Sequence, residues 1–355
     1  TFNPAKGRPS LDSGEAITEL TGTSLKIGTP VSFQDARGST HLPILLMANG
    51  EKINYTNGTA ITAEIADVDA PVNVTQLGIY STILLANDTA EADGTQVYFS
   101  AVGNPLSWVA ADYFEPNIKT DAVKVLNCGW GKILILGEQS CEMWYLADNG
   151  TFYRYAGGYS ERGTSAVHSV VQADNTWYWI DNFRRVVRLN GITPEIISTP
   201  FDKLIQSFSN VSDCVAKLIE ANGKALIVFS FASAKRTLVY NYMLKSWSEW
   251  SFWNPEGDNS EREGYEQWLG EQHCWCPDWG FHLVSSRYDG SPYGGKIYKL
   301  SNTIYKDDDK TIRLVRRTGH IDYGTMNQKR SNRMFVRVKR GVGNTDVAIP
   351  QLMLR

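Results

Sequence analysis

The chain has 355 residues, of which 42% are hydrophobic and 21% are charged, and its formal net charge is −3. This composition is ordinary for a globular protein, and the charge excludes a nucleic-acid binder that works by bulk positive charge. The sequence has no apolar run of membrane-spanning length, so we expect no membrane insertion by this chain and no secretory leader.

Residues 1–40 contain few strand signals and much Gly, Pro, Ser and Thr, which predicts an extended N-terminal arm. The first strand-rich segment follows directly. An apolar run there leads into Asn49-Gly50, and a second short run ends at Asn57-Gly58. Asn-Gly pairs tolerate the left-handed backbone angles of tight hairpins, so this segment reads as antiparallel strands.

The same pattern of apolar β-type runs separated by Asn, Asp and Gly recurs along residues 41–302. The apolar runs begin 39 to 56 residues apart. The six candidate repeats are His41–Gly58, Leu77–Phe114, Asp121–Tyr155, Gly163–Pro200, Ala216–Phe252 and Trp268–Asn302. A period of this size, with about four short strands per unit, is typical of β-propeller blades.

The fourth repeat shows the pattern most clearly. We expect strands at Ala166–Val171, Trp177–Ile180 and Val186–Leu189, with turns at Asp174-Asn175 and Asp181-Asn182. The sequence therefore predicts an all-β fold whose main part, residues 41–302, is a six-bladed β-propeller. An irregular two-sheet sandwich is the alternative; it explains the alternation but not six units of similar build.

Residues 303–355 differ from the repeats and predict a separate basic β segment, part of an additional and incomplete C-terminal β domain. Lys306 to Arg355 carries a net charge of +7, so the preceding residues carry −10. We expect strands at Arg313–Arg316, His320–Tyr323 and Arg333–Lys339. Three consecutive Asp at 307–309 favour a charged turn over a calcium loop, whose ligands alternate.

The five cysteines are odd in number and unevenly spaced, which argues against a disulfide framework. Cys274 and Cys276 flank one residue and are expected on one face of a strand. With His273 and His282 nearby, a metal site is conceivable, but this spacing is shorter than that of known zinc pairs. A pair of half-buried strand cysteines is the preferred interpretation.

No enzyme motif stands in its required context, so we expect no catalytic activity and no cofactor. A propeller glycosidase would need paired carboxylates, for which the candidates are Glu142, Glu195, Glu220 and Asp322, and nothing in the sequence pairs them. His168 lies within an expected strand and reads as a packed or interface residue.

Basic residues form two groups that could contact another subunit, a partner or DNA phosphates. Arg184 and Val186 are expected on one strand face, and Arg185 and Val187 on the other. A solvated strand face is the simpler alternative, and contact with another protein is favoured over contact with DNA. The candidate residues are Arg184, Arg185, Arg188, Arg316, Arg317, Lys329, Arg330, Arg333, Arg337, Lys339 and Arg340.

Three segments carry a resemblance to a known family. Val97–Trp108 resembles a Pro- and Trp-containing turn of phage tail proteins. Arg185–Ile205 is similar to the blade-closing segment, and Arg317–Val336 to the start of the following β domain, in the packaged-DNA stabilisation proteins of short-tailed bacteriophages.

The resemblance implies a structural virion protein, the tail hub or nozzle subunit. Such proteins form a homo-oligomeric ring, typically a hexamer, below the portal and its adaptor protein. The ring surrounds the channel for double-stranded DNA, retains the packaged genome, and docks tail fibres, spikes or a needle. Localisation would be the virion tail, assembled in the bacterial host cytoplasm. The alternative is a glycan-binding or glycan-cleaving propeller, whose exposed Trp and Tyr would stack on sugars.

Overall fold

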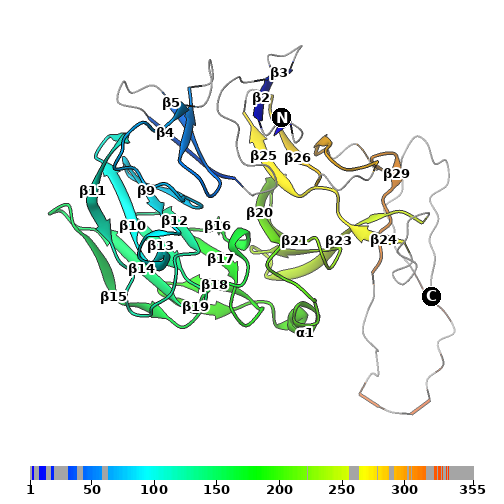
Figure 1. Ribbon diagram of the computed structural model, residues 1–355. Helices are drawn as coiled ribbons and strands as arrows, with labels where there is room; N and C mark the ends of the chain where they lie inside the picture. The colour runs from blue at the N-terminus through cyan, green and yellow to red at the C-terminus, as the bar shows by residue number, and fades with distance from the viewer. Residues whose placement is uncertain are drawn as a thin grey trace. The chain divides into compact units, whose positions relative to one another are not determined.

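The structure is a computed structural model of the chain (Figure 1). It describes residues 2–3, 8–12, 17–19, 31–37, 43–57, 63–221, 223–255, 264–277, 279–287, 292–301, 304, 306–316, 324–325, 327–328, 330, 333 and 335. Strands dominate this part of the chain, and its helices are short: α1 (Asp202–Gln206) and the 3₁₀ turns η1 (Glu91–Gly94), η2 (Val167–Ser169) and η3 (Thr199–Phe201). The described residues form no helix long and apolar enough to cross a bilayer.

Each of the first four repeats forms a four-stranded antiparallel sheet in which consecutive strands are neighbours. Figure 1 follows these sheets from blue to green. The strands of the first two sheets are β4 (Ser32–Arg37), β5 (Pro43–Ala48), β6 (Asn54–Thr56), β7 (Ala63–Glu64), then β8 (Leu77–Tyr80), β9 (Ile83–Asn87), β10 (Val97–Ala101) and β11 (Asn104–Phe114). Those of the third and fourth are β12 (Val125–Gly129), β13 (Lys132–Leu136), β14 (Cys141–Leu146), β15 (Phe152–Ser160), then β16 (Val171–Ala173), β17 (Thr176–Ile180), β18 (Val186–Asn190) and β19 (Thr193–Ile196).

The fifth and sixth repeats continue this topology with five and three strands among the described residues. Their strands are β20 (Cys214–Ala221), β21 (Lys224–Phe231), β22 (Arg236–Asn241), β23 (Ser246–Trp253), β24 (Tyr265–Gln267), then β25 (Gln272–Cys276), β26 (Phe281–Ser285) and β27 (Ile297–Lys299). These six sheets are the blades of a six-bladed β-propeller, which confirms the predicted fold class.

Two smaller sheets flank the six blades in sequence. Near the N-terminus, β1 (Phe2–Asn3), β2 (Arg8–Asp12) and β3 (Ile17–Glu19) form a three-stranded sheet. After the last blade, β28 (Lys306–Asp307) and β29 (Lys310–Thr311) form a hairpin. Asp308 and Asp309 join them with φ angles of 44° and 69°, the left-handed values of a two-residue hairpin turn.

The chain divides into two compact units. The first comprises Thr1–Ala234 and Tyr240–Trp247, and the second comprises Lys235–Val239 and Ser248–Arg355. The first unit contains the first four blades, and the second contains the sixth blade and the β28–β29 hairpin.

Apolar side chains fill the space between consecutive sheets of the first unit. Adjacent residues of one strand point to opposite sides. Leu84 packs toward the first sheet and Leu85 toward the third. In β13, Ile135 packs toward the second sheet and Leu134 toward the fourth. Both faces of these strands are therefore buried, which explains why they read as continuous apolar runs rather than as alternating ones.

Some expected strands are absent or displaced. Ala166–Val171 is not a strand: Val167–Ser169 is a 3₁₀ turn, and β16 begins only at Val171. The Thr164 and Ser169 hydroxyls both donate to the Ala166 carbonyl, at 3.0 and 2.7 Å, and so replace the strand hydrogen bonds.

Outside the fourth blade, two further segments differ from expectation. The first blade begins at β4, inside the stretch expected to be an extended arm. Arg313–Arg316 has no strand pairing, so that prediction was wrong. His320–Tyr323 and most of Arg333–Lys339 lie outside the described residues.

Candidate functional site

Asp181 organises the turn that carries two of the predicted basic residues. Its carboxylate is fully buried and accepts hydrogen bonds from the backbone N–H groups of Phe183 and Arg185, both at 2.9 Å. Arg162 Nη1 lies 2.8 Å from Asp181 Oδ2, and Arg185 Nε lies 3.7 Å from it. One buried carboxylate is thus held by two guanidinium groups and two backbone donors.

The three arginines of this blade are engaged within the protein. Arg184 donates to the Phe208 carbonyl at 2.9 Å, and Arg188 forms an ion pair with Asp174 at 3.2 Å. Arg184 and Arg185 precede β18 and belong to the turn, so their predicted alternation with Val186 and Val187 on two strand faces was wrong. The turn forms because Asp181 captures the N–H groups that a strand would have paired.

The predicted basic residues of the C-terminal segment are only partly described. Arg316, Arg330 and Arg333 are exposed. The others, Arg317, Lys329, Arg337, Lys339 and Arg340, lie outside the described residues.

The candidate glycosidase carboxylates have separate structural partners. Glu142 is buried and accepts from Trp144 Nε1 at 2.9 Å and from the Ile118 N–H at 3.1 Å. Glu220 accepts from the Tyr242 hydroxyl at 2.8 Å, and Glu195 lies opposite Arg188 in the β18–β19 ladder. Asp322 lies outside the described residues.

The His and Cys residues of the sixth blade lie on opposite faces of one hairpin. Cys274 pairs with Leu283, whereas Trp275 pairs with His282, so the two cysteines share one face and His273 shares the other with His282. The Cys274 and Cys276 sulfurs are 3.8 Å apart, and His273 Nε2 is 2.9 Å from His282 Nδ1. One ion cannot reach both pairs, and no group of three metal ligands occurs among the described residues.

A pocket of about 420 Å³ lies in the first unit, where the first strands of three blades begin. Its lining includes Gln76 ahead of β8, Lys124 ahead of β12, and His168 ahead of β16. Lys124 pairs with Glu138 at 3.0 Å, and burial lowers the pKa of His168. The pocket is therefore lined by a mixture of polar and apolar side chains, without a strong net charge.

Asn87 fixes the wall of this pocket. Its fully buried amide accepts from the N–H groups of Thr75 and Gln76, at 3.1 and 2.8 Å, and donates to the Val123 carbonyl at 3.3 Å. The Asn87 side chain thus links the segments that lead into β8 and β12. Nothing in this lining selects a ligand class.

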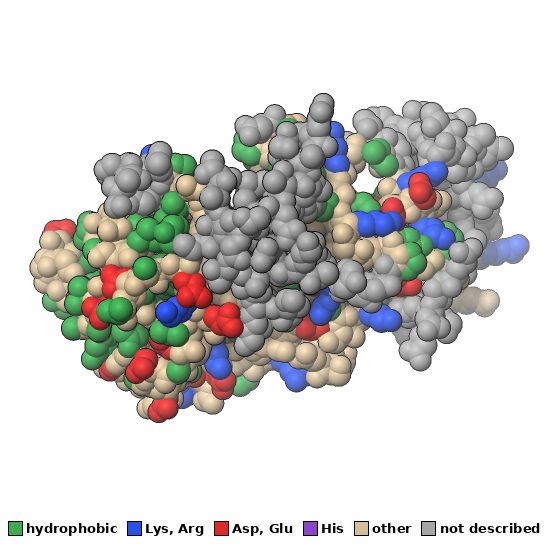
Figure 2. Space-filling view, turned by 45° about the horizontal axis from the view of Figure 1, so that its top comes forward, with side chains coloured by type: hydrophobic (Ala, Val, Ile, Leu, Met, Phe, Trp, Pro, Cys, Tyr) green, Lys and Arg blue, Asp and Glu red, His purple; other side chains and the backbone are tan. Residues whose placement is uncertain are grey.

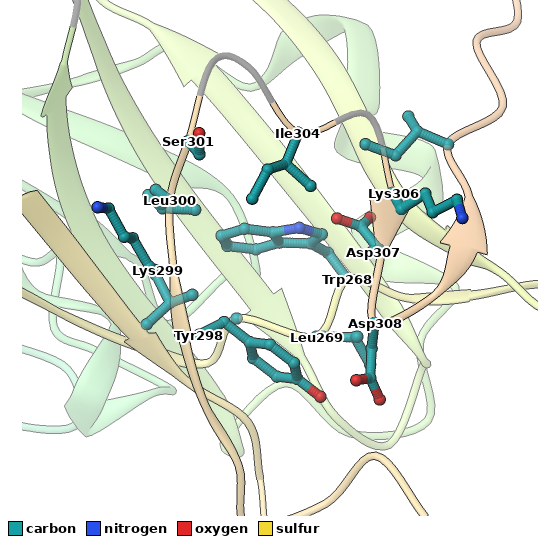
Figure 3. Close-up of a pocket in the computed structure, with 13 residues that line it drawn as sticks. Trp268, Leu269, Tyr298, Lys299, Leu300, Ser301, Ile304, Lys306, Asp307 and Asp308 are labelled. Carbon is teal, nitrogen blue, oxygen red and sulfur yellow. The ribbon is translucent and has the colours of Figure 1, made fainter. Parts of the chain in front are cut away.

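A second pocket, of about 120 Å³, lies in the second unit between the last blade and the β28–β29 hairpin (Figure 3). Figure 3 shows the Trp268 indole across its middle, with the Asp307 carboxylate beside the ring. The amino groups of Lys299 and Lys306 point away from the ring. The interior of the pocket is therefore aromatic and acidic.

Three contacts build this second pocket. Trp268 packs against Gly270, where an added Cβ would lie 2.5 Å from the indole, so only glycine admits the ring. The edge of Trp250 contacts Trp268 with ring centroids 5.0 Å apart. On the opposite wall, Lys296 Nζ lies 2.7 Å from Asp308 Oδ2, which fixes the hairpin turn.

The two aspartates of this pocket differ in environment. Asp308 is paired with Lys296, and the nearby Tyr298 hydroxyl donates to the Tyr293 carbonyl at 3.3 Å. Burial, and then the charge of Asp308, raise the pKa of Tyr298 to about 12. Burial alone raises the pKa of Asp307, because no described residue donates a hydrogen bond to it or forms an ion pair with it. Asp307 is thus a desolvated carboxylate facing an aromatic ring.

Sequence reasoning missed the second pocket, because Trp268 and Asp307 are 39 residues apart in the chain. The Asp-rich turn could be predicted from the sequence, but the direction of its side chains could not.

No protein-family model and no curated protein match this sequence. Among solved structures, the computationally designed Ika8 protein is 11% identical, with a TM-score of 0.43 over 79% of this chain and 76% of that one. The dihydro-heme d1 dehydrogenase NirN is 11% identical, with a TM-score of 0.47 over 81% of this chain and 59% of NirN. Hsv2 of Kluyveromyces lactis is 8% identical, with a TM-score of 0.42 over 73% of this chain and 72% of that one. Identities of this size say nothing about activity.

Proposed function

We propose that this chain is a non-enzymatic structural subunit of a bacteriophage tail, the hub or nozzle protein of a short-tailed phage. Copies of it assemble as a ring below the portal and adaptor protein, and we expect this ring to be a hexamer. The ring lets packaged double-stranded DNA pass, retains it before ejection, and docks tail fibres, spikes or a needle.

The segment Val97–Trp108, which carries part of the resemblance to tail proteins, forms a firmly anchored hairpin. It comprises β10 and the first part of β11. Trp108 is buried; its backbone N–H donates to Asp67 at 2.9 Å and its indole to the Pro105 carbonyl at 3.1 Å. The hydrogen bond from Trp108 is the main reason that the pKa of Asp67 is lowered.

The observation that carries the proposal is the apolar edge that this hairpin presents. Tyr98 pairs with Tyr113 and Ser100 with Trp108, so residues 109–112 of β11 lie opposite a single residue of β10 and bulge outward. Val109 and Tyr113 are 50% and 42% exposed, and Val102 at the hairpin tip is 78% exposed. An edge strand with exposed apolar side chains favours association with another chain.

The occupant that we assign to this edge is a second copy of the chain. Figure 2 shows hydrophobic side chains gathered at the left of the molecule, where Figure 1 places β10, β11 and β15. A head-to-tail ring buries such an edge against a different surface of each neighbour. The exposed Arg316, Arg330 and Arg333 suit contact with the acidic remainder of a neighbouring subunit.

The engaged arginines of the fourth blade fit a conduit for DNA. Arg185 and Arg188 are already paired with Asp181 and Asp174. Arginines that are paired within the protein form few contacts with phosphates, so the ring would surround the DNA without binding it tightly.

The test is the assembly state of the purified chain, by sedimentation velocity and electron-microscope class averages across protein concentration. We expect six-fold rings with a lumen wider than duplex DNA. A charge at the edge, in V109E, should weaken assembly by at least roughly tenfold, since a buried unpaired charge is costly. The matched control is Leu244→Glu, because Leu244 is 75% exposed in the β22–β23 turn. Monomers at every concentration, or equal loss in both variants, would contradict the proposal.

A further inference from the structure

The Trp268 pocket combines one aromatic face with one unpaired carboxylate. Asp307 is half-buried, and among the described residues nothing neutralises its charge. Holding a carboxylate in this state disfavours the folded protein at neutral pH, since desolvation penalises the charged form. Such a group persists more readily where a ligand of opposite charge completes it.

The charges around the pocket favour a cation over an anion. Lys296 is already paired with Asp308. Lys299 lies over the Phe281 ring, with its Nζ 4.2 Å from the ring centroid, and its amino group points out of the pocket. The Lys306 amino group also points outward in Figure 3. An anion entering here would meet the Asp307 carboxylate, and the one ammonium group beside Asp308 is already neutralised by that aspartate.

The size of the pocket limits the ligand. A volume of about 120 Å³ is the share of roughly four water molecules in the liquid. This admits the end of an alkylammonium chain or a guanidinium group. Leu269, Ile304 and Ile312 supply apolar contact for methylene groups.

We propose that this pocket binds an organic cation, with its ammonium or guanidinium group seated between the Asp307 carboxylate and the Trp268 indole. Cations are attracted to the face of an indole, and a carboxylate at its edge adds a charge-assisted hydrogen bond. The shared chemistry comes from two sources: a free polyamine, or a Lys or Arg side chain of another polypeptide. The site does not depend on ring formation.

Isothermal titration calorimetry of the full chain, at matched ionic strength, tests the proposal with four probes: butylammonium, spermidine, the peptide acetyl-Gly-Lys-Gly-amide, and neutral glucose. We expect the cations to bind and glucose not to bind. Tighter binding of spermidine than of the peptide assigns a free polyamine, and the reverse assigns a side chain. Failure of all cations to bind, or binding of glucose alone, overturns the proposal.

Variants locate the binding. Asp307→Asn should weaken cation binding roughly 10- to 100-fold, the range for loss of a charged hydrogen-bond partner. Trp268→Leu should weaken it roughly 2- to 30-fold. The matched control is Asp309→Asn, which removes the same charge from an exposed position of the same turn and should leave binding unchanged. Equal loss in D307N and D309N would indicate general electrostatic attraction and refute the site.

A second readout separates a ligand-binding role from a structural one. The folded-state pKa of Asp307 is raised by burial, so stability falls as the pH rises above the ordinary carboxyl pKa, and the full cost of the charge is present above the raised value. We therefore expect D307N to raise the urea midpoint at pH 7 while it weakens cation binding. A carboxylate retained for structure would give the opposite change in midpoint.

Discussion

Replacing Asp181 by Asn removes the charge at the centre of the turn before β18 while keeping its shape. The Asn Oδ1 can still accept the backbone N–H groups of Phe183 and Arg185, which lie 2.9 Å from the present carboxylate oxygen. What is lost is the attraction to the guanidinium groups of Arg162 and Arg185.

The magnitude follows from burial. Breaking a fully buried ion pair by removing one partner costs about 3–5 kcal/mol. Here the acid is fully buried, but the Arg162 and Arg185 side chains are 29% and 23% exposed, so water can partly solvate the charges that remain. We expect D181N to lower the free energy of unfolding by about 2–3 kcal/mol.

The assay is urea unfolding followed by tryptophan fluorescence. The buried Trp179 reports on this region, since its indole donates to the Gly163 carbonyl at 3.2 Å. Asp174→Asn is the control: its side chain is 53% exposed and pairs with Arg188, so its loss should cost less than about 0.5 kcal/mol. A D181N protein within 0.5 kcal/mol of the wild type, on the order of an exposed pair, would refute the reasoning.

Three further substitutions test close packing, backbone conformation and burial in the first unit. Gly163→Ala should cost about 3 kcal/mol in the same unfolding assay, because its Cβ would lie 2.3 Å from the backbone carbonyl carbon of Glu138. Gly191→Ala, with open space but a φ of 65°, should cost only about 1 kcal/mol, and equal costs would contradict the packing argument. Burial lowers the pKa of His168 below 6.5, so the unfolded chain binds its proton more readily and stability should fall as the pH drops through 6.5. His168→Gln should reduce this fall between pH 7.5 and 5.5, and an unchanged fall would assign it to other groups.

Strand positions were predictable where apolar runs and turn residues agreed. Trp177–Ile180 and Val186–Leu189 form strands as expected, because both sides of these strands face neighbouring sheets. The strand predicted at Ala166–Val171 did not form, although four of its six residues are apolar. Its backbone partners are the hydroxyls of Thr164 and Ser169, and such local competition depends on side-chain geometry that a pattern of residue types does not contain.

The candidate sites were less predictable than the fold. From the sequence, Arg185 and Arg188 were interpreted as unpaired charges. In the structure, Arg185 pairs with Asp181, four residues earlier, and Arg188 pairs with Asp174 across one hairpin. The positions of Asp181 and Asp174 in the sequence would have allowed these ion pairs to be predicted. The proximity of Trp268 and Asp307 could not be predicted from the sequence, because it depends on how the β28–β29 hairpin packs beside the last blade.

The strict succession of strands within each blade has a consequence for how the chain acquires its structure. Every ladder in the first four blades joins segments adjacent in sequence, so each hairpin closes a short loop and can form early. The apolar layers, however, lie between blades. A blade that has just left the ribosome therefore has its hydrogen bonds but only one covered face until the next arrives. Folding should advance blade by blade from the N-terminus, and hydrogen exchange should find neighbouring blades opening together.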